Sequence, residues 1–491
     1  IWSVSYYVRM KSLQQKTISG IIWSSVQRFG AMTITFAANV ILARLLSPSD
    51  FGCVGMLMIF IGLSNTFIDG GFGAALIQKK EPTQEDYSTI FYWNILLSII
   101  LYILLYITAP LIAKFYHIPL LSIVLRVQGV VLIFNALSVV QNNLFRKQLR
   151  FKQLSVVEIV SAILSLILAI AAALNGWGVW SLVIQQIALS VFKTGLLWTL
   201  GNWYPNIVFS FASFRELFKF GSFMLLANLF STLSNEIQGL LVGRVFSPAI
   251  LGLYTQSYRL EGSMATAVSG VIDQVTYPVM SSIQDEKGKL ILALRKFVQI
   301  PAYICALVMG LMIVVAKPLI LLVYGENWLD CVPYFQILCT AGLAVCLQGS
   351  ANNSIVAIGK SSVFFKWTIV KRSVTIILCV VGIWIGGMHG MLWMSVLGAW
   401  VVYVINAYLV DKYIGYRFID QFKDILPFIV LATLDAVLVY YIGSYMCLNI
   451  FVVAIIQCVL YISVYLVISW LFKFESFVYI ENVLKKKFLE R

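Results

Sequence analysis

Several ionisable side chains interrupt stretches of the sequence that are otherwise apolar, and they are the residues whose chemistry stands out. Arg28, Asp69, Glu236, Arg259 and Asp273 each lie in a run of mostly hydrophobic residues. An ionised group in hydrocarbon is costly, so such residues normally face a water-filled cavity or an oppositely charged partner. An arginine cannot shed its charge. Arg28 and Arg259 therefore predict a polar cavity inside a membrane protein.

The acidic members of this set, Asp69, Glu236 and Asp273, have more than one interpretation. They could be counter-ions for the arginines, sites for a coupled H+ or Na+, or groups that join helices. Asn39 and Asn235 lie on polar stripes of the first and seventh apolar stretches. These amides could line the same cavity or hold helices together through hydrogen bonds.

No pattern in the sequence is typical of a catalytic or metal site. The 8 cysteines form no CxxC pair, and there are only 2 histidines. Gly359-Lys360-Ser361 resembles the end of a phosphate loop, but Ser354 stands where that motif needs glycine. We therefore expect no catalytic residue, no metal and no cofactor other than a coupled H+ or Na+.

The elements that must position these residues are membrane spans. Hydrophobic residues make up 60% of the chain and charged residues 11%, against roughly half and a quarter in soluble domains. About fourteen stretches have the roughly 20 apolar residues that a membrane-spanning helix needs. The prediction is an all-α polytopic membrane protein with about fourteen transmembrane helices. The net charge of +14 is assigned to topology and lipid contact rather than to nucleic acid.

A weak internal repeat organises these spans. Arg44 with Ser47-Pro48 and Gly52 returns as Arg244 with Ser247-Pro248 and Gly252. Each Ser-Pro pair is expected to end or turn a helix, so the two arginines lie near the outer ends of spans. There they could act in a gate or extend to the lipid headgroups. The repeat predicts two matched six-helix lobes with a substrate cavity between them.

The predicted domain boundaries follow from this repeat. They are a cytoplasmic N-terminal segment (1–16), an N-lobe (17–202), a linker with a C-lobe (203–409), a final helix pair (410–472) and a cytoplasmic tail (473–491). Most lysines and arginines fall in loops on one side, which predicts that both termini are cytoplasmic. Lys371 and Arg372, at the cytoplasmic start of a predicted span, are interpreted as positive charges that anchor the span at the membrane surface. No cleavable signal peptide is visible, and Met10 could be the natural start.

Four segments carry a resemblance to a known family, and they are 44–52 (RLLSPSDFG), 69–86 (DGGFGAALIQKKEPTQED), 146–152 (RKQLRFK) and 324–328 (YGENW). In order and spacing they resemble bacterial polysaccharide flippases of the O-antigen and colanic-acid type. These belong to the multidrug/oligosaccharidyl-lipid/polysaccharide exporter superfamily. The resemblance runs from about residue 16 to at least residue 424.

The resemblance implies a fold like that of multidrug exporters and the lipid II flippase, with two additional C-terminal helices. It implies alternating access that moves undecaprenyl-diphosphate-linked oligosaccharides to the outer leaflet of the bacterial inner membrane, for surface polysaccharide biosynthesis. By similarity to the lipid II flippase, Arg28 would meet the pyrophosphate. The implied partners are the lipid-linked oligosaccharide, the bilayer, and a polysaccharide polymerase with glycosyltransferases.

Two other functions compete with this one. A cation-coupled multidrug exporter of the same fold would be expected to have an acidic cavity, and Arg28 argues against it. A membrane polysaccharide polymerase would be expected to carry a large catalytic loop outside the membrane, whereas the loops here are short.

Overall fold

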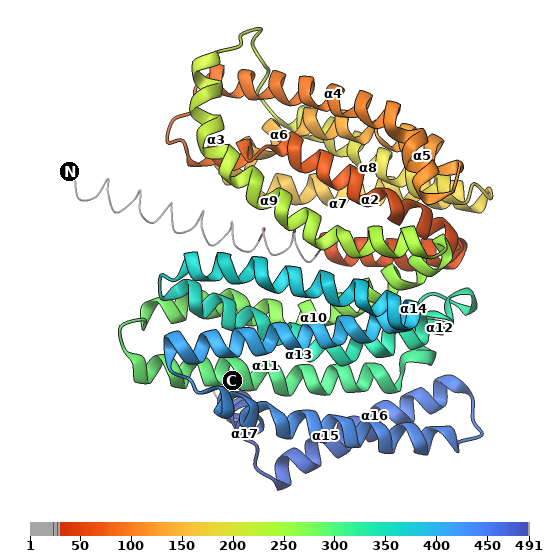
Figure 1. Ribbon diagram of the computed structural model, residues 1–491, viewed down its shortest axis with the longest axis vertical. Helices are drawn as coiled ribbons and strands as arrows, with labels where there is room; N and C mark the ends of the chain where they lie inside the picture. The colour runs from red at the N-terminus through yellow and green to blue at the C-terminus, as the bar shows by residue number, and fades with distance from the viewer. Residues whose placement is uncertain (1–22, 24–26, 28–29, 490–491) are drawn as a thin grey trace. The chain divides into compact units, whose positions relative to one another are not determined.

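The computed structural model describes residues 23, 27 and 30–489, and in this part of the chain every regular element is a helix (Figure 1). The all-α prediction is confirmed. Arg28 lies outside the described residues. After a helix at Gly30–Leu45, the elements up to the linker are α2 (Pro48–Asp69), α3 (Phe72–Gln78), α4 (Gln84–Tyr116), α5 (Leu120–Gln128), α6 (Val131–Lys147), α7 (Phe151–Leu174) and α8 (Val179–Leu200).

The second half of the chain continues with long helices. They are α9 (Phe211–Val245), α10 (Pro248–Ser282), α11 (Lys287–Val314), α12 (Ala316–Val323), the short 3-10 helix Glu326–Trp328, α13 (Cys331–Ala357), α14 (Ser361–Ile414), α15 (Phe418–Ser444), α16 (Ile450–Leu471) and α17 (Glu475–Leu489). The tail, for which an amphipathic helix is one interpretation of the sequence, is helical in α17.

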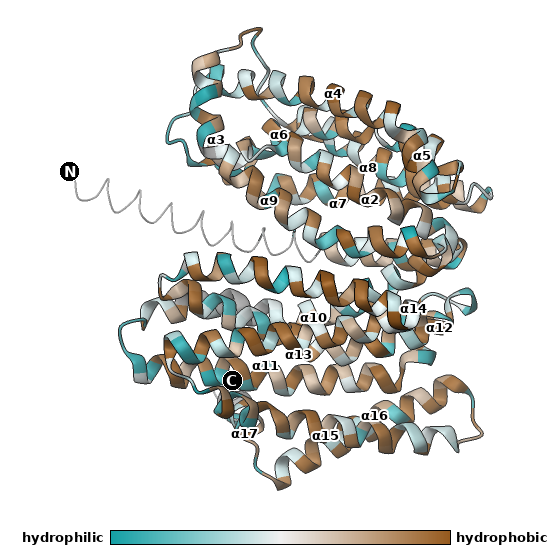
Figure 2. Ribbon diagram, in the orientation of Figure 1, coloured by the Kyte–Doolittle hydropathy of each residue, from teal (hydrophilic) through white to brown (hydrophobic). Residues whose placement is uncertain are grey.

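Apolar side chains dominate these helices (Figure 2), and the chain is a multi-pass membrane protein. Among the described residues, 10 helices are long and apolar enough to cross a membrane, or 11 if the two parts of the bent α9 count as one span. α14 contains two of the spans expected from the sequence, because Gly386 and Gly387 break its helical backbone. α10 and Gly30–Leu45 correspond to two further expected spans, so the figure of about fourteen remains a prediction.

Local sequence signals explain where several helices begin and end. Ser47 and Asp50 cap each other's backbone at the start of α2, with Pro48 in the first helical position. Thr83 and Asp86 form the same reciprocal cap on α4. α2 ends at Asp69, and the next residue, Gly70, has a left-handed φ of 54° that favours glycine.

The linker between α8 and α9 is anchored to the first turns of α4. The backbone N–H of Asn206 donates to Ser88 Oγ over 3.0 Å, and that of Ser210 donates to Thr89 Oγ1 over 3.0 Å. Trp203 Nε1 donates to Gln84 Oε1 over 2.6 Å. These bonds fix the point from which α9 starts.

Contacts divide the chain into two units, Ile1–Gly252 and Leu253–Arg491. α9 therefore groups with the first unit, whereas the sequence-based boundaries assign it to the C-lobe. The physical reason is its packing on α2 and α3, where Phe72 lies 5.9 Å from Phe214 and 6.2 Å from Phe218 between ring centroids. The predicted lobe boundaries describe the repeat, and they remain a prediction.

In the second unit, the final helix pair packs on α11. Tyr465 of α16 donates to the backbone carbonyl of Tyr303 over 3.0 Å. Arg295 of α11 and Asp424 of α15 form a two-pronged ion pair, with both N–O distances 2.7 Å. Tyr416, in the turn between α14 and α15, also donates to Asp424. Burial, reinforced by this hydrogen bond, raises the pKa of Tyr416 above its usual range.

Candidate functional site

The acidic and amide residues predicted for a cavity lie on helices of both units. In the first unit, Asp69 ends α2 and is half-buried, while Asn235 on α9 is exposed and Glu236 is half-buried. Asn39 is half-buried in Gly30–Leu45. In the second unit, Asp273 lies on α10, and its side chain is outside the described part of the structure.

Neutral polar groups join α2 to its neighbours beside Asp69. Asn135 of α6 donates to Asn65 of α2 over 2.9 Å, and Thr66 of α2 shares a hydrogen bond of 3.0 Å with Thr232 of α9. Such bonds stabilise contacts between helices in a membrane. The small polar residues on this face of α2 therefore act at least partly as packing groups.

The repeated Ser-Pro-Gly motif forms one reciprocal contact within the first unit. A methyl group on Gly52 would lie 1.7 Å from the carbonyl oxygen of Pro248, and one on Gly252 would lie 1.9 Å from that of Pro48. The starts of α2 and α10 thus pack backbone to backbone, which only glycine permits. The match between Gly52 and Gly252 in the sequence is explained by this contact.

The arginines of that motif are both exposed beside this contact. The guanidinium of Arg244 lies 5.0 Å from the ring centroid of Phe115, a distance typical of a cation–π contact. Arg44 ends the helix that leads to the cap of α2. The structure places both residues at helix ends, as the sequence predicts.

Arg259 is exposed on α10 in the second unit. Its charge acts on Tyr324, which belongs to the YGENW segment and is buried. Burial raises the pKa of Tyr324 above its usual range, and the positive charge of Arg259 works in the opposite direction.

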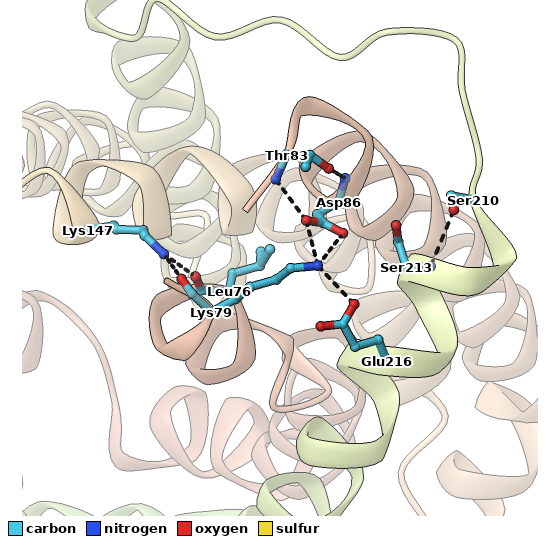
Figure 3. Close-up of polar contacts among 8 residues, drawn as sticks. All are labelled: Leu76, Lys79, Thr83, Asp86, Lys147, Ser210, Ser213 and Glu216. Atoms are coloured by element: carbon cyan, nitrogen blue, oxygen red, sulfur yellow. Dashed lines mark hydrogen bonds and ion pairs between the residues drawn. The ribbon is translucent and has the colours of Figure 1, made fainter. Parts of the chain in front are cut away.

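A network of charges that the sequence analysis did not single out joins α3, α4 and α9 of the first unit (Figure 3). Lys79 Nζ lies 3.0 Å from Asp86 Oδ2 and 3.0 Å from Glu216 Oε2. Burial lowers the pKa of Lys79, but hydrogen bonds to Glu216 and Asp86 and their charges outweigh it, so the net shift is upward. The ammonium is held in its charged form.

A second lysine, Lys147 of α6, closes the C-terminal end of α3. Its Nζ donates to the backbone carbonyl of Leu76 over 2.8 Å and also to that of Lys79. Cations are stabilising at this end of a helix, where carbonyl groups lack partners. A Thr-x-x-Asp capping pattern at residues 83–86 was the signal that could have located this network.

An apolar pocket of about 680 Å³ lies in the second unit, between α11, α13, α14 and α15. Aromatic rings of Trp393, Trp400, Tyr440 and Tyr441 form much of its wall. Its glutamine and threonine side chains donate to backbone carbonyls, as Gln336 does to Ile313 over 3.0 Å and Thr433 to Ile429 over 2.7 Å. The pocket therefore suits a hydrocarbon chain better than a polar ligand.

Lys371 of α14 does not behave as the membrane-surface anchor that the sequence suggests. Its side chain is only 6% exposed, whereas the neighbouring Arg372 is exposed. The anchor interpretation of Lys371 is wrong, because this face of α14 packs on α13. The hydropathy of a span does not predict which of two adjacent cationic side chains is buried against a neighbouring helix.

A protein-family model named "Polysaccharide biosynthesis protein" matches residues 41–333, which include all four segments singled out in the sequence. The chain belongs to this family. The match extends across both copies of the Ser-Pro-Gly motif, and therefore across the contact between Gly52 and Gly252. The resemblance drawn from the segments is confirmed.

Curated relatives of this family member share about a quarter of its residues. The teichuronic acid biosynthesis protein TuaB of Bacillus subtilis is 26% identical over 435 residues, covering 87% of this chain and 89% of the relative. The lipopolysaccharide biosynthesis protein WzxC of Escherichia coli is 25% identical, covering 81% and 80%. The succinoglycan biosynthesis transport protein ExoT of Rhizobium meliloti is 21% identical, covering 80% and 81%.

Solved structures show which fold the family member has. The lipid II flippase MurJ, in an inward closed conformation, aligns with a TM-score of 0.74 at 16% identity, covering 92% of this chain and 98% of MurJ. An inward-facing multidrug transporter of the MATE family aligns with a TM-score of 0.61 at 16% identity, covering 80% and 98%. The predicted MATE/lipid II flippase-like fold is confirmed.

Proposed function

We propose that this protein moves oligosaccharides linked to undecaprenyl diphosphate from the cytoplasmic to the outer leaflet, for surface polysaccharide biosynthesis. The family match at residues 41–333 carries the proposal. The relatives are named for teichuronic acid, lipopolysaccharide and succinoglycan. Related proteins that are named for different polymers are best explained by a shared step, which is passage of a lipid-linked precursor across the membrane.

The substrate of that step has a polar head and an apolar tail, and the chain offers a suitable environment for each. A diphosphate with attached sugars cannot cross hydrocarbon, while a polyprenyl tail is soluble there. The apolar pocket of the second unit, about 680 Å³ in volume, fits part of such a tail. We propose that the tail occupies this pocket while the head group is sheltered in a polar cavity.

We assign the head group to Arg28 and Arg259, with Asn39 and Asn235 as neutral polar contacts. A guanidinium can donate two parallel hydrogen bonds to phosphate oxygens, and it remains charged when desolvated. Alternating access would then carry the head outward, and an inside-negative potential favours an anion leaving by about 2.3 kcal/mol per charge per 100 mV. Arg44 and Arg244 are proposed gate residues.

Ion coupling, location and partners complete the proposal. Asp69, Glu236 and Asp273 are proposed counter-ions or sites for a coupled H+ or Na+. The protein would lie in the bacterial inner membrane with both termini in the cytoplasm, and it would perform no chemistry itself. Glycosyltransferases would supply its substrate, and a polysaccharide polymerase would use the product.

The test uses purified protein in liposomes with lipid-linked precursor extracted from the host strain that lacks this gene. Precursor in the outer leaflet is measured by its accessibility to a membrane-impermeant glycosidase. We expect protein-dependent transfer that falls at least tenfold in Arg259→Ala, with Arg372→Ala as a matched surface control. Conversion of the precursor to polymer would show an enzyme, and transport of organic cations without precursor transfer would show a multidrug exporter.

A further inference from the structure

Lys371 lies inside the second unit, and its hydrogen-bond partners among the described residues are two neutral amides. Its Nζ donates to Asn352 Oδ1 of α13 over 3.0 Å and to Asn406 Oδ1, in the second half of α14, over 2.9 Å. The ring centroid of Phe364 lies 5.5 Å from the same nitrogen. Lys371 thus connects α13 with both halves of α14.

Within the described part of the chain, no carboxylate lies within ion-pair distance of Lys371. The charged neighbour on its own helix is Arg372, which repels it. α13 has no acidic residue. On α11 and α15, Arg295 and Asp424 are paired with each other, and Tyr403 on the second half of α14 is a neutral phenol.

The amide of Asn406 lacks a hydrogen-bond acceptor in this arrangement of described residues. Asn406 is fully buried, and its Nδ2 has no hydrogen-bond acceptor among the residues that the structure describes. Turning the amide over would aim Nδ2 at Lys371, but an ammonium has no lone pair to accept a hydrogen bond. A neutral amine has one. Releasing one proton from Lys371 would therefore remove an unpaired buried charge and also provide an acceptor for Asn406 Nδ2.

We propose that Lys371 is a proton-exchange site that the protein fills in one conformation and empties in another. The step is Lys–NH3+ to Lys–NH2, with the proton passing to water, and Asn406 reverses its amide to donate to the amine. A buried lysine can shed its charge in this way, whereas an arginine cannot. The site stands on the geometry of the second unit, and its coupling to flipping rests on the proposed function.

The corresponding hairpin of the first unit offers a natural control. In the repeat, Phe151-Lys152 and Gly176 match Phe365-Lys366 and Gly390, which aligns α7 and α8 with the two halves of α14. In the first-unit hairpin, Lys193 lies 3.5 Å from the carboxylate of Glu158. A lysine paired with a carboxylate has no comparable reason to release its proton. Proton exchange is thus expected in one hairpin of the repeat and not in the other.

The first test measures the proton directly, without any substrate. Protein labelled with 15N-lysine is placed in lipid nanodiscs, and the signal lost in Lys371→Arg is assigned to Lys371. We expect this signal to titrate at a pH where exposed lysines remain charged. Asn406→Asp, which keeps the acceptor and adds a carboxylate, should abolish that titration. A Lys371 signal that stays charged together with the exposed lysines would overturn the proposal.

The second test asks whether the proton is coupled to transfer of the lipid-linked precursor. A pH gradient across liposomes should accelerate transfer by wild-type protein, and this acceleration should be lost in Asn406→Asp and Lys371→Met but kept in Glu158→Gln. Titration of Lys371 with unchanged acceleration in Asn406→Asp would overturn the coupling. Titration in a protein that transfers no precursor would leave the site standing and count against the proposed function alone.

Discussion

The two units differ in how some of their charged residues are paired. In the first unit, Lys79 contacts two carboxylates and Lys193 contacts Glu158. In the second unit, Arg295 is paired with Asp424. Among the described residues, however, Lys371 has no carboxylate partner, and both carboxylate oxygens of Asp435 are buried without a hydrogen bond. Paired charges favour one rigid arrangement, whereas an unpaired buried charge costs free energy that is recovered when a lysine loses a proton or an aspartate gains one. We therefore expect the paired contacts to be rigid, and we expect Lys371 and Asp435 to be the groups of the second unit that respond to protons.

The largest effect is expected where the repeat makes the same contact twice. Gly52→Ala and Gly252→Ala each place a methyl group within 2 Å of a backbone carbonyl, at 1.7 Å and 1.9 Å. Backbone cannot move aside as a side chain can, so we expect each change to destabilise the protein by about 3 kcal/mol or more. Thermal unfolding of detergent-extracted protein measures the loss.

Two other glycines, one on α9 and one on α10, provide the controls. A methyl group on Gly239 of α9 or Gly262 of α10 would meet no atom within 4 Å. Alanine at these positions should be neutral or stabilising by up to about 1 kcal/mol. Equal tolerance of alanine at all four glycines would show that the reciprocal contact does not support the fold.

Removing a buried carboxylate from the first unit should have the next largest effect. The Asp86 side chain is 1% exposed, caps α4 and contacts Lys79. Asp86→Ala removes the cap and leaves Lys79 with only its exposed partner, so we expect a loss of about 2–3 kcal/mol in the free energy of unfolding. A shift of less than half that size would mean that the network is not a rigid element.

Much of the fold could be predicted from sequence, because membrane spans are long apolar runs and helix starts carry local caps. Ser47-Pro48, for example, marks the start of α2 where the structure has it. The partners of charges could not be predicted in the same way. Lys371 and Arg372 have adjacent positions and similar chemistry, and only the packing of α14 on α13 buries one of them. Asp86 gains its lysine through a contact between helices that no spacing fixes.

An unpaired acid of the second unit should respond in the opposite direction to Asp86. Asp435 on α15 is 2% exposed, and in the described part of the chain neither of its oxygens has a hydrogen-bond partner. Asp435→Asn removes the ionisable group at nearly constant volume, so we expect stability at neutral pH to be unchanged or raised by about 1 kcal/mol. Thermal unfolding of Asp435→Asn is compared with that of Asp86→Asn, so that both units receive the same substitution. Equal destabilisation by both changes would remove the contrast between the units.

The smallest effect is expected at the outer partner of Lys79. The Glu216 side chain is 64% exposed and lies 3.0 Å from Lys79 Nζ, the same distance as Asp86. Solvent screens an exposed pair, so Glu216→Ala should cost less than about 1 kcal/mol, and the cost should fall as salt is added. The double variant with Asp86→Ala tests whether the two carboxylates act together. If the double variant loses as much free energy of unfolding as the two single variants together, the two pairs are independent. A larger loss would mean that Glu216 stabilises Lys79 more strongly once Asp86 is absent.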